Sequence, residues 1–295
     1  MQKAVIFGAG VLGKMIYSEI RETSDVLFFI DNQPQHYSRN PSLPEILHPQ
    51  VLQERSFDII YIGSADGKDN MYHQLTRVVG VPPQKIDFSF TEKSLELTYT
   101  HCVLPRIRFL EQLAEYAHTH CIDGCVAELG VNNGDFAKEI NRVFSDRRLY
   151  LFDSFDGFSE DDLKTEEVKN ERFLQLKEWA TRANLSFTSN SPKKAWDKLP
   201  FPEKCTMKVG YFPESFDLKH ESFAFVNLDM DLYHPVKSGL EIFYPRMSHG
   251  GVILVHDYFA ASTYGVKRAV DEFVMMNKIA ATPIGDFISV AIVKT

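Results

Sequence analysis

The chain contains the same pattern twice: an apolar strand, a glycine-rich turn, an amphipathic helix, and a second apolar strand that ends in an aspartate. The first copy covers residues 2–31 and carries the turn Gly8-Ala-Gly-Val-Leu-Gly13. The second copy covers residues 124–153 and carries the turn Glu128-Leu-Gly-Val-Asn-Asn-Gly134. Strands that alternate with helices build a parallel sheet covered by helices, so the chain is predicted to fold into α/β domains.

We place a boundary near residue 95, between a small Rossmann-like α/β domain over residues 1–95 and a second α/β domain over residues 96–295. Residues 104–117 have the apolar spacing of an amphipathic helix that leads into the second domain. Residues 159–183 are rich in acids and lysines and predict a charged helix, Glu166 to Thr181, which is either a solvated surface helix or a lid. Residues 278–294 predict two strands that form a hairpin at the end of the second domain.

The composition narrows the class of partner. The chain has 295 residues, of which 44% are hydrophobic, and a formal net charge of -8 without a cluster of lysine or arginine. This charge argues against nucleic acid or an acidic membrane and favours a small molecule. The apolar start is too short for a signal peptide or a membrane span, so we expect a cytoplasmic protein. Four cysteines without a zinc-site spacing indicate reduced thiols, and a homo-oligomer is compatible with the sequence.

Metal-capable side chains follow two apolar runs in the second domain. Residues 225–228 are followed by Asp229 and Asp231, and residues 251–255 are followed by His256 and Asp257. Because strand side chains alternate between faces, Asp229 and Asp231 would point the same way if the extended geometry continued to the tip. The two runs predict a shared site at one edge of a parallel sheet.

The first glycine turn, Gly8 to Gly13, has two interpretations. Its glycines would let backbone amides approach a phosphate at a helix N-terminus, with Asp31 accepting hydrogen bonds from ribose hydroxyls. The same glycines also serve to pack a helix closely against a strand. An NAD-dependent epimerase or dehydrogenase of nucleotide sugars would begin in this way, but the first domain carries no Tyr-x-x-x-Lys pair. A non-catalytic nucleotide-binding scaffold is a further alternative.

Several segments of the second domain follow one another in an order that resembles one family. After the turn at residues 128–134 come Leu151-Phe-Asp-Ser-Phe-Asp-Gly-Phe158, Lys208-Val-Gly-Tyr-Phe-Pro-Glu-Ser215, Val226-Asn-Leu-Asp-Met-Asp-Leu-Tyr233, Val255-His-Asp-Tyr258 and Gly265-Val-Lys-Arg-Ala-Val-Asp-Glu-Phe273. Together they resemble the TylF/macrocin O-methyltransferase family, whose cofactor is S-adenosylmethionine. The resemblance implies a class I methyltransferase fold, a doubly wound sheet that ends in an antiparallel hairpin.

The resemblance also implies which residues bind the cofactor. The glycines would let the chain wrap around the methionine part of S-adenosylmethionine, and Asp153 would hold both ribose hydroxyls. For Asp153 and Glu128 the alternative is ordinary solvation at a strand end. The implied cofactor residues are Glu128, Gly130, Asn132, Gly134, Asp153 and Ser154, and the aromatic candidates for the wall of the site, or for plain packing, are Phe155, Phe212, Tyr233 and Tyr258.

For the chemistry, the resemblance implies that Asp229 and Asp257 bind a metal and that Asp231 is the general base for the accepting hydroxyl. His234 is a second candidate base or a hydrogen-bonded residue at a helix start. His256 stands where the family has a carboxylate, which leaves four interpretations. It retunes the site to another divalent ion, leaves a magnesium site with one ligand fewer, acts as a base without metal, or only completes a strand end.

We predict that Asp229, His256 and Asp257 bind magnesium or manganese. The sequence thus predicts an S-adenosylmethionine-dependent O-methyltransferase, assisted by a divalent metal, that acts on a hydroxyl of a sugar or a glycosylated small molecule. The acceptor itself is left open, because the segments that would select it show no recognisable pattern.

Overall fold

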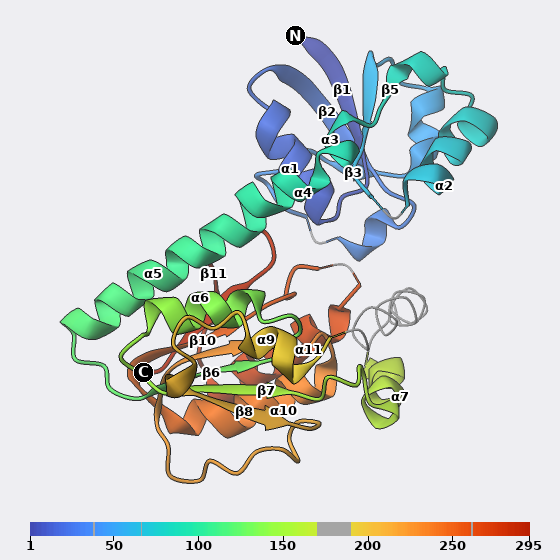
Figure 1. Ribbon diagram of the computed structural model, residues 1–295. Coiled ribbons are helices and arrows are strands. Elements are labelled where there is room, and N and C mark those ends of the chain that lie inside the picture. Colours follow the sequence, from blue (N-terminus) through green and yellow to red (C-terminus); the bar gives the residue numbers. More distant parts are fainter. Residues whose placement is uncertain (38, 66, 170–189, 261) are drawn as a thin grey trace. The chain divides into compact units, whose positions relative to one another are not determined.

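The chain divides between Leu104 and Pro105 into two units, Met1–Leu104 and Pro105–Thr295. The computed structural model describes residues 1–37, 39–65, 67–169, 190–260 and 262–295 (Figure 1). The boundary predicted near residue 95 falls inside α4 (Ser94–Thr98), which continues through η5 (Tyr99–Val103) into α5 (Leu104–Thr119). Because the division lies within a helical run, no loop marks it in the sequence. None of the described helices combines the length and the apolar character needed to span a membrane.

The first unit contains a parallel five-stranded sheet in the order β3-β2-β1-β4-β5. Side chains alternate along β1, so Phe7 packs with Leu75 on one face. Ile6 packs with Ile16 on the other face. The elements of this unit are β1 (Gln2–Phe7), α1 (Val11–Ile20), β2 (Ser24–Ile30), η1 (Pro34–His36), β3 (Ile46–Leu47), η2 (Pro49–Gln53), β4 (Ile59–Ile62), α2 (Lys68–His73), η3 (Gln74–Val79), η4 (Pro83–Lys85), β5 (Ile86–Asp87) and α3 (Ser89–Glu92), followed by α4 and η5.

The second unit contains a seven-stranded sheet in the order β11-β12-β10-β9-β6-β7-β8. The strands from β10 to β8 in this order are parallel, while β12 runs antiparallel to β10 and β11 runs antiparallel to β12. This arrangement confirms the doubly wound sheet with a closing hairpin. After α5, the elements are β6 (Cys125–Leu129), α6 (Asp135–Val143), β7 (Leu149–Asp153), α7 (Glu160–Lys169), α9 (Pro192–Trp196), η6 (Pro202–Lys204), β8 (Cys205–Val209), β9 (Phe223–Leu228), α10 (Tyr233–Phe243), η7 (Tyr244–Arg246), β10 (Met247–Val255), α11 (Tyr264–Asn277), β11 (Thr282–Pro283) and β12 (Val290–Val293).

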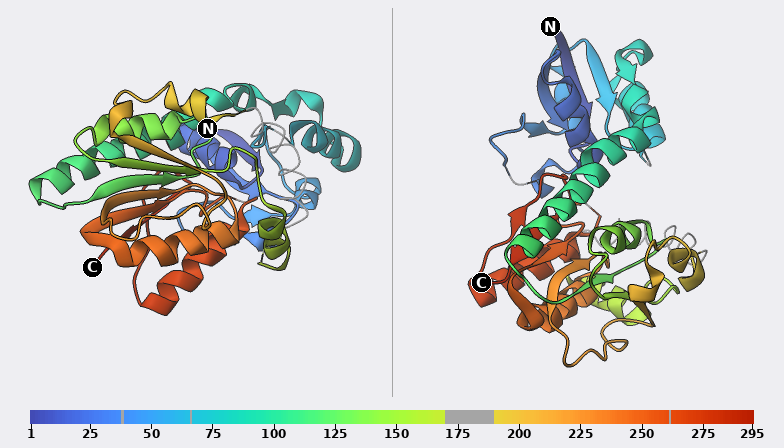
Figure 2. Two further views of the ribbon diagram at one scale, coloured as in Figure 1. Left: turned by 60° about the horizontal axis from the view of Figure 1, so that its bottom comes forward. Right: turned by 60° about the vertical axis from the view of Figure 1, so that its left-hand side comes forward.

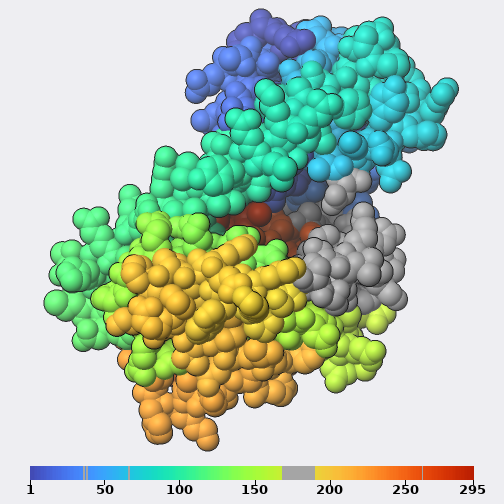
Figure 3. All heavy atoms as spheres, in the orientation of Figure 1, coloured from blue at the N-terminus to red at the C-terminus, as the bar shows by residue number. Residues whose placement is uncertain are grey.

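Helices cover both faces of this second sheet (Figure 2). On one face, α10 and α11 pack through residues such as Leu240 and Phe273. On the other face, α5 and α6 pack through residues such as Leu110 and Ile140. The central strands β6 and β9 are buried along their whole length, which explains why they read as apolar runs rather than as alternating patterns. In the space-filling view, the yellow segment around α9 lies at the surface of this unit (Figure 3).

The order of the strands places a topological switch between β6 and β9. After β6 the chain continues to β7 and β8 on one side, and after β9 it continues to β10 on the other side. The loops at the carboxyl ends of β6 and β9 therefore diverge and open a crevice, which is where open α/β sheets bind ligands. At their first residues, before they diverge, the two loops lie close together. Gly130 permits this contact, because its φ is 85° and a Cβ there would lie 1.9 Å from the carbonyl oxygen of Asp229.

Three elements differ from the sequence predictions. Residues 32–49 are rich in proline, asparagine and serine and thus predict a loop, but they contain the two-residue edge strand β3, which pairs with the end of β2. The edge strand β8, which is not among the predicted strands, is partly buried: Cys205 and Met207 pack against the core, whereas Val209 is exposed. The charged helix predicted at Glu166 to Thr181 begins earlier, as α7, and residues 170–189 lie outside the described part of the chain.

Candidate active site

Four side chains that follow β9 and β10 meet at one cavity, as the sequence predicts for neighbouring parallel strands. They are Asp229, Asp231, His256 and Asp257. The reason differs from the prediction in one respect, because β9 ends at Leu228 and Asp231 has a left-handed backbone with a φ of 62°. Asp229 and Asp231 thus reach the same cavity through a sharp turn rather than through a continued strand.

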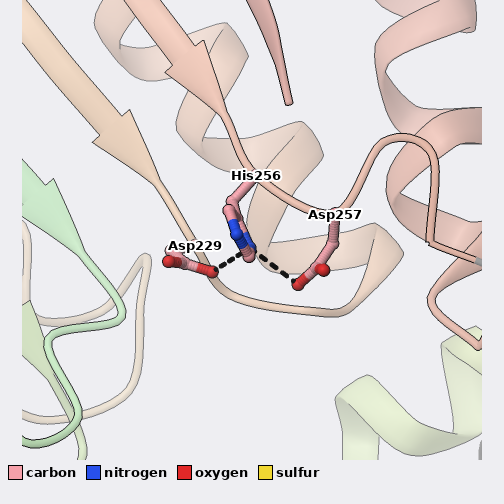
Figure 4. Close-up of side chains that lie close together, drawn as sticks. All are labelled: Asp229, His256 and Asp257. Atoms are coloured by element: carbon pink, nitrogen blue, oxygen red, sulfur yellow. Dashed lines mark ion pairs between the residues drawn. The ribbon is translucent and has the colours of Figure 1, made fainter. Parts of the chain in front are cut away.

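The imidazole of His256 lies between two carboxylates (Figure 4). Its Nδ1 is 3.0 Å from Oδ1 of Asp229 and 3.1 Å from Oδ2 of Asp257. Burial disfavours the charged imidazolium, but the negative charges of Asp229 and Asp257 outweigh burial and raise the pKa of His256 to about 10. As an imidazolium, His256 holds the two carboxylates together at the end of the sheet.

Asp231 and Asp257 interact directly and titrate together. Burial, followed by the negative charge of Asp257, raises the pKa of Asp231 well above its usual range. Burial acts in the same sense on Asp257, but the charge of His256 outweighs it, and the pKa of Asp257 is lowered. This is the arrangement expected for two acids that share a proton, and it makes Asp231 the member of the pair that holds a proton more tightly.

Arg106 belongs to the same cluster, although it lies in none of the sequence motifs. Its Nη2 donates a hydrogen bond to Oδ2 of Asp229 at 3.3 Å, and its guanidinium lies 3.7 Å from the centre of the Phe136 ring. Arg106 is buried on the face of α5 that also buries Leu110 and Leu113. An arginine within the apolar stripe of a helix is the signal that would have identified it, because buried charges require a partner.

One cavity of about 390 Å³ is lined by Asp229, Asp231, His256 and Asp257, together with most of the predicted cofactor residues. It also has an aromatic wall, which includes Phe155 and Phe212, as considered from the sequence, and additionally Phe158 and Tyr211. Tyr233 and Tyr258 are not part of the lining. The predicted cofactor residues that line the cavity are Gly130, Asn132, Asp153 and Ser154, and the acids include Asp162 of α7, which the sequence did not single out.

The carboxylate of Asp153 is oriented by backbone amides. Its Oδ2 accepts a hydrogen bond from the N–H of Asn132 at 2.8 Å, and its Oδ1 accepts one from the N–H of Phe155 at 2.7 Å. These bonds tie the end of β7 to the second glycine turn. Since each carboxylate oxygen has two acceptor sites, Asp153 retains capacity for hydroxyl donors. The hydroxyl of Ser154 donates to the carbonyl of Gly157 at 3.0 Å.

Two of the predicted cofactor residues, Glu128 and Gly134, do not line the cavity. Glu128 is 1% exposed, and its Oε1 accepts a hydrogen bond from Nδ2 of Asn227 on the neighbouring strand β9 at 3.1 Å. Burial raises the pKa of Glu128 well above its usual range. A Cβ on Gly134 would lie 2.8 Å from Cα of Ala195, so this glycine permits α9 to pack closely. Contact of Glu128 or Gly134 with a cofactor stays a prediction.

His234, the second candidate base, also lies outside the lining of the cavity. It is the second residue of α10, and its Nδ1 is 2.7 Å from Oδ1 of Asp162 on α7. This geometry matches the alternative considered for His234, a hydrogen-bonded residue at a helix start. Its role as a base stays a prediction, and Asp231 is the better placed of the two.

In the first unit, the glycine turn has the close packing that is the alternative to nucleotide binding. A Cβ on Gly13 would lie 1.9 Å from the carbonyl oxygen of Gly8. Oδ2 of Asp31 accepts hydrogen bonds from the N–H of Ala9 at 3.2 Å and from the hydroxyl of Tyr37 at 3.0 Å. These contacts account for Gly8, Gly13 and the aspartate, whereas a Cβ on Gly10 would have no neighbour within 4 Å. Binding of a nucleotide at this turn stays a prediction.

Comparisons with known proteins agree with this fold. The family profile described as macrocin-O-methyltransferase (TylF) matches residues 69–292. A mycinamicin III 3''-O-methyltransferase of Micromonospora griseorubida is 23% identical over 202 residues, which cover 64% of this chain and 78% of that protein. The structure of the O-methyltransferase NovP is similar with a TM-score of 0.52 and 22% identity, over 65% of this chain and 80% of NovP, a likeness that supports the fold. Because the family match covers most of the sequence, the chain belongs to the macrocin O-methyltransferase (TylF) family.

Proposed function

We propose that this O-methyltransferase moves a methyl group from S-adenosylmethionine to a hydroxyl of a sugar or a glycosylated small molecule, beside a divalent metal ion. The observation that carries the proposal is the shared cavity, whose lining joins Asp153 and the second glycine turn to Asp231. A cofactor held at the first and a hydroxyl held at the second would face each other in one space, as transfer requires. The sugar class is suggested by the relative that acts as a mycinamicin III 3''-O-methyltransferase.

The candidate metal ligands Asp229, His256 and Asp257 fit a divalent ion, which would take the place of the proton on Nδ1 of His256. One ligand atom from each of the three lies within 4.8 Å of the others. The Nδ1 of His256 is buried and makes no well-aligned hydrogen bond among the described residues, although it faces two carboxylate oxygens. Because one donor is nitrogen, the set suits manganese better than magnesium, which prefers oxygen ligands. A divalent ion would supply Lewis acidity and fix the direction of a bound hydroxyl.

The residues of the chain would supply positioning, proton transfer and the exclusion of water. Asp153 would accept hydrogen bonds from the ribose hydroxyls of the cofactor. Asp231 would take the proton of the accepting hydroxyl. At the same time the oxygen of that hydroxyl would form a bond to the methyl carbon, and the bond between the methyl carbon and the sulfur of S-adenosylmethionine would break. Asp231 would act in its ionised form, and its raised pKa makes this carboxylate a stronger base than usual. The aromatic wall would exclude water from the cavity.

This proposal can be tested with methyl-labelled S-adenosylmethionine and a panel of deoxysugar glycosides, in the presence of MnCl₂ or MgCl₂. The measurement is the transfer of label to each glycoside. We expect label on at least one glycoside. Asp231→Asn should lower turnover by about 10²- to 10⁴-fold, which is the usual contribution of a general base. Asp146→Asn is a matched control, because the Asp146 side chain is 69% exposed on the surface. Transfer by Asp231→Asn at the unmodified rate would contradict the assignment of the base.

Metal binding is tested separately by calorimetry with MnCl₂. We expect His256→Ala to weaken Mn²⁺ binding, because it removes one of three ligand atoms. His249→Ala changes an exposed histidine of β10 and should leave the affinity for Mn²⁺ unchanged. Equal affinities of the two variants, or full transfer activity after treatment with a chelator, would rule out a metal at this site.

A further inference from the structure

We infer that Glu166 is a positioning residue of the active site: its buried carboxylate on α7 holds the start of α10 and thereby fixes the turn that carries Asp229 and Asp231. The contacts of Glu166 that support this inference involve neither the cofactor nor the metal. The inference rests on the proposed function only where the effect of a variant on turnover is interpreted.

Glu166 is fully buried, although it lies in a helix of mostly charged residues. Its Oε2 accepts a hydrogen bond of 2.7 Å from the backbone N–H of Tyr233, the first residue of α10. The first amides of a helix have no acceptor within the helix and are usually capped by the side chain of the preceding residue. That residue is Leu232, whose side chain cannot accept a hydrogen bond. Glu166 therefore supplies, from another helix, the cap that α10 lacks in its own sequence.

A glycine makes room for this carboxylate. A Cβ on Gly265, the second residue of α11, would lie 2.1 Å from Oε1 and 2.4 Å from Oε2 of Glu166. Any larger residue at position 265 would displace the carboxylate. Glu166 thus lies against the N-terminal turns of both α10 and α11, where the partial positive charge of each helix end favours a negative group.

A second acid of α7 contacts the same turn of α10. Asp162 precedes Glu166 by one helical turn, so both side chains are on the same face of α7. Asp162 is 9% exposed, and its Oδ1 lies 2.7 Å from Nδ1 of His234. Because Asp162 also lines the cavity, the docked face of α7 forms part of the active site.

The turn between β9 and α10 consists of residues 229–232 and is held at both ends. At its beginning, the N–H of Asp229 donates to the carbonyl of Leu129 on β6 at 2.8 Å. At its end, the N–H of Tyr233 donates to Glu166. Asp231 lies between these anchors with a left-handed backbone, which costs free energy and persists only where the surroundings impose it. Loss of the second anchor would let Asp231 leave its position in the cavity.

Hydrogen–deuterium exchange of the Tyr233 amide in the full chain tests this inference directly. Glu166→Ala should speed exchange of that amide by about 10- to 100-fold, as expected for loss of a hydrogen bond to a charged group. Glu166→Gln keeps an acceptor and should restore part of the protection. Gly265→Ala should act like Glu166→Ala, because its Cβ displaces the carboxylate while every polar group remains. Asp161→Asn, a change of a fully exposed neighbour on α7, should have no effect.

Turnover and cofactor binding separate positioning from a merely structural role. We expect Glu166→Ala and Gly265→Ala to bind S-adenosylmethionine like the unmodified chain, because Asp153 is untouched, and to lose at least about 10-fold in kcat, with partial recovery in Glu166→Gln. The inference would be overturned if hydrogen exchange at the Tyr233 amide were unchanged, or if exchange became faster throughout the protein. It would also be overturned if exchange at Tyr233 became faster while kcat stayed the same. An unmodified chain that binds no S-adenosylmethionine would defeat the proposed function instead, and the exchange result would still decide whether Glu166 holds Tyr233.

Discussion

Two cationic side chains hold the carboxylate of Asp229 from different elements. Arg106 approaches Oδ2 from α5, and His256 approaches Oδ1 from the end of β10. The acids and His256 could be predicted from the sequence because they stand in motifs at strand ends. The apolar stripe of α5 marks Arg106 as buried, but the sequence does not identify Asp229 as its partner, because the two residues are 123 positions apart. Motifs reveal residues that act together within a short segment, whereas long-range charge pairs become visible only in the fold.

Replacing Arg106 by methionine tests the importance of this charge pair. Arg106→Met keeps an apolar stem against Phe136 but leaves Asp229 without its guanidinium partner. The pair is partly buried, with side-chain exposures of 10% and 22%, so we expect the free energy of unfolding to fall by about 2–4 kcal/mol. Urea unfolding followed by circular dichroism measures the loss. Arg108→Met, at an exposed position of α5, should cost less than about 0.5 kcal/mol. Similar losses in the two variants would show that the contact with Asp229 does not matter for stability.

Helix α11 holds the two tyrosines that follow the acid motifs of the site. The hydroxyl of Tyr233 donates to Glu272 at 2.6 Å, and the hydroxyl of Tyr258 donates to Asp271 at 2.6 Å. From the sequence these tyrosines were candidates for the wall of the cavity. The structure shows instead that they tie the first turn of α10 and the loop after β10 to one helix.

The pH dependence of stability provides a test of this tie. The hydrogen bond from Tyr233 is the largest influence that lowers the pKa of Glu272, to about 2 from a usual value of 4.5. A carboxyl group whose pKa is depressed by folding stabilises the fold above its unfolded pKa, and this contribution is lost as the pH falls through the folded pKa. Between pH 4.5 and 2, the unmodified chain should therefore lose stability more steeply than Glu272→Gln. Parallel unfolding profiles of the two proteins over this window would contradict the tie, and Glu241→Gln, at an exposed acid of α10, serves as the control.

The close approach of the loops after β6 and β9 can be tested by replacing a glycine. Gly130 and Gly285 both have left-handed backbones, with φ of 85° and 88°, but only Gly130 faces an atom, the carbonyl oxygen of Asp229. Gly285→Ala should cost about 1–2 kcal/mol for the strained backbone alone. Gly130→Ala should cost about 1–3 kcal/mol more, because the added methyl group overpacks the contact. Thermal or urea unfolding measures both changes, and equal costs would mean that the loops separate freely.

The elements that were predicted well share a physical cause. The strands β6 and β9 are buried on both faces and α6 has a strong apolar stripe, so hydrophobic spacing revealed them. The edge strand β3 has only two residues and β8 is only partly buried, so neither forms the long apolar run of a central strand. Helix α7 docks through two buried acids rather than through an apolar stripe, so its composition looked like that of a solvated surface.

The same sequence pattern, a glycine turn followed by a strand-end aspartate, occurs in both units of the molecule, but the aspartate has different surroundings in each. Both units place a glycine turn after their first strand and an aspartate at the end of the next. In the first unit Asp31 is bonded to the turn itself and to Tyr37. In the second unit Asp153 shares a cavity with the acids that follow β9 and β10. The repeated pattern therefore predicts the fold of both units, whereas the chemistry depends on the segments that surround only the second turn.

Calorimetric titration of the full chain with S-adenosylmethionine tests whether the second unit binds the cofactor, because Asp153 and Asp31 provide a matched pair of variants. We predict one binding site per chain, and Asp153→Ala should weaken binding by about 10- to 100-fold through the loss of hydrogen bonds to a charged group. Asp31→Ala changes the equivalent position of the first unit and should leave the affinity unchanged. Absence of binding by the unmodified chain, or a loss of affinity in Asp31→Ala but not in Asp153→Ala, would contradict the assignment of the methyl-transfer site to the second unit.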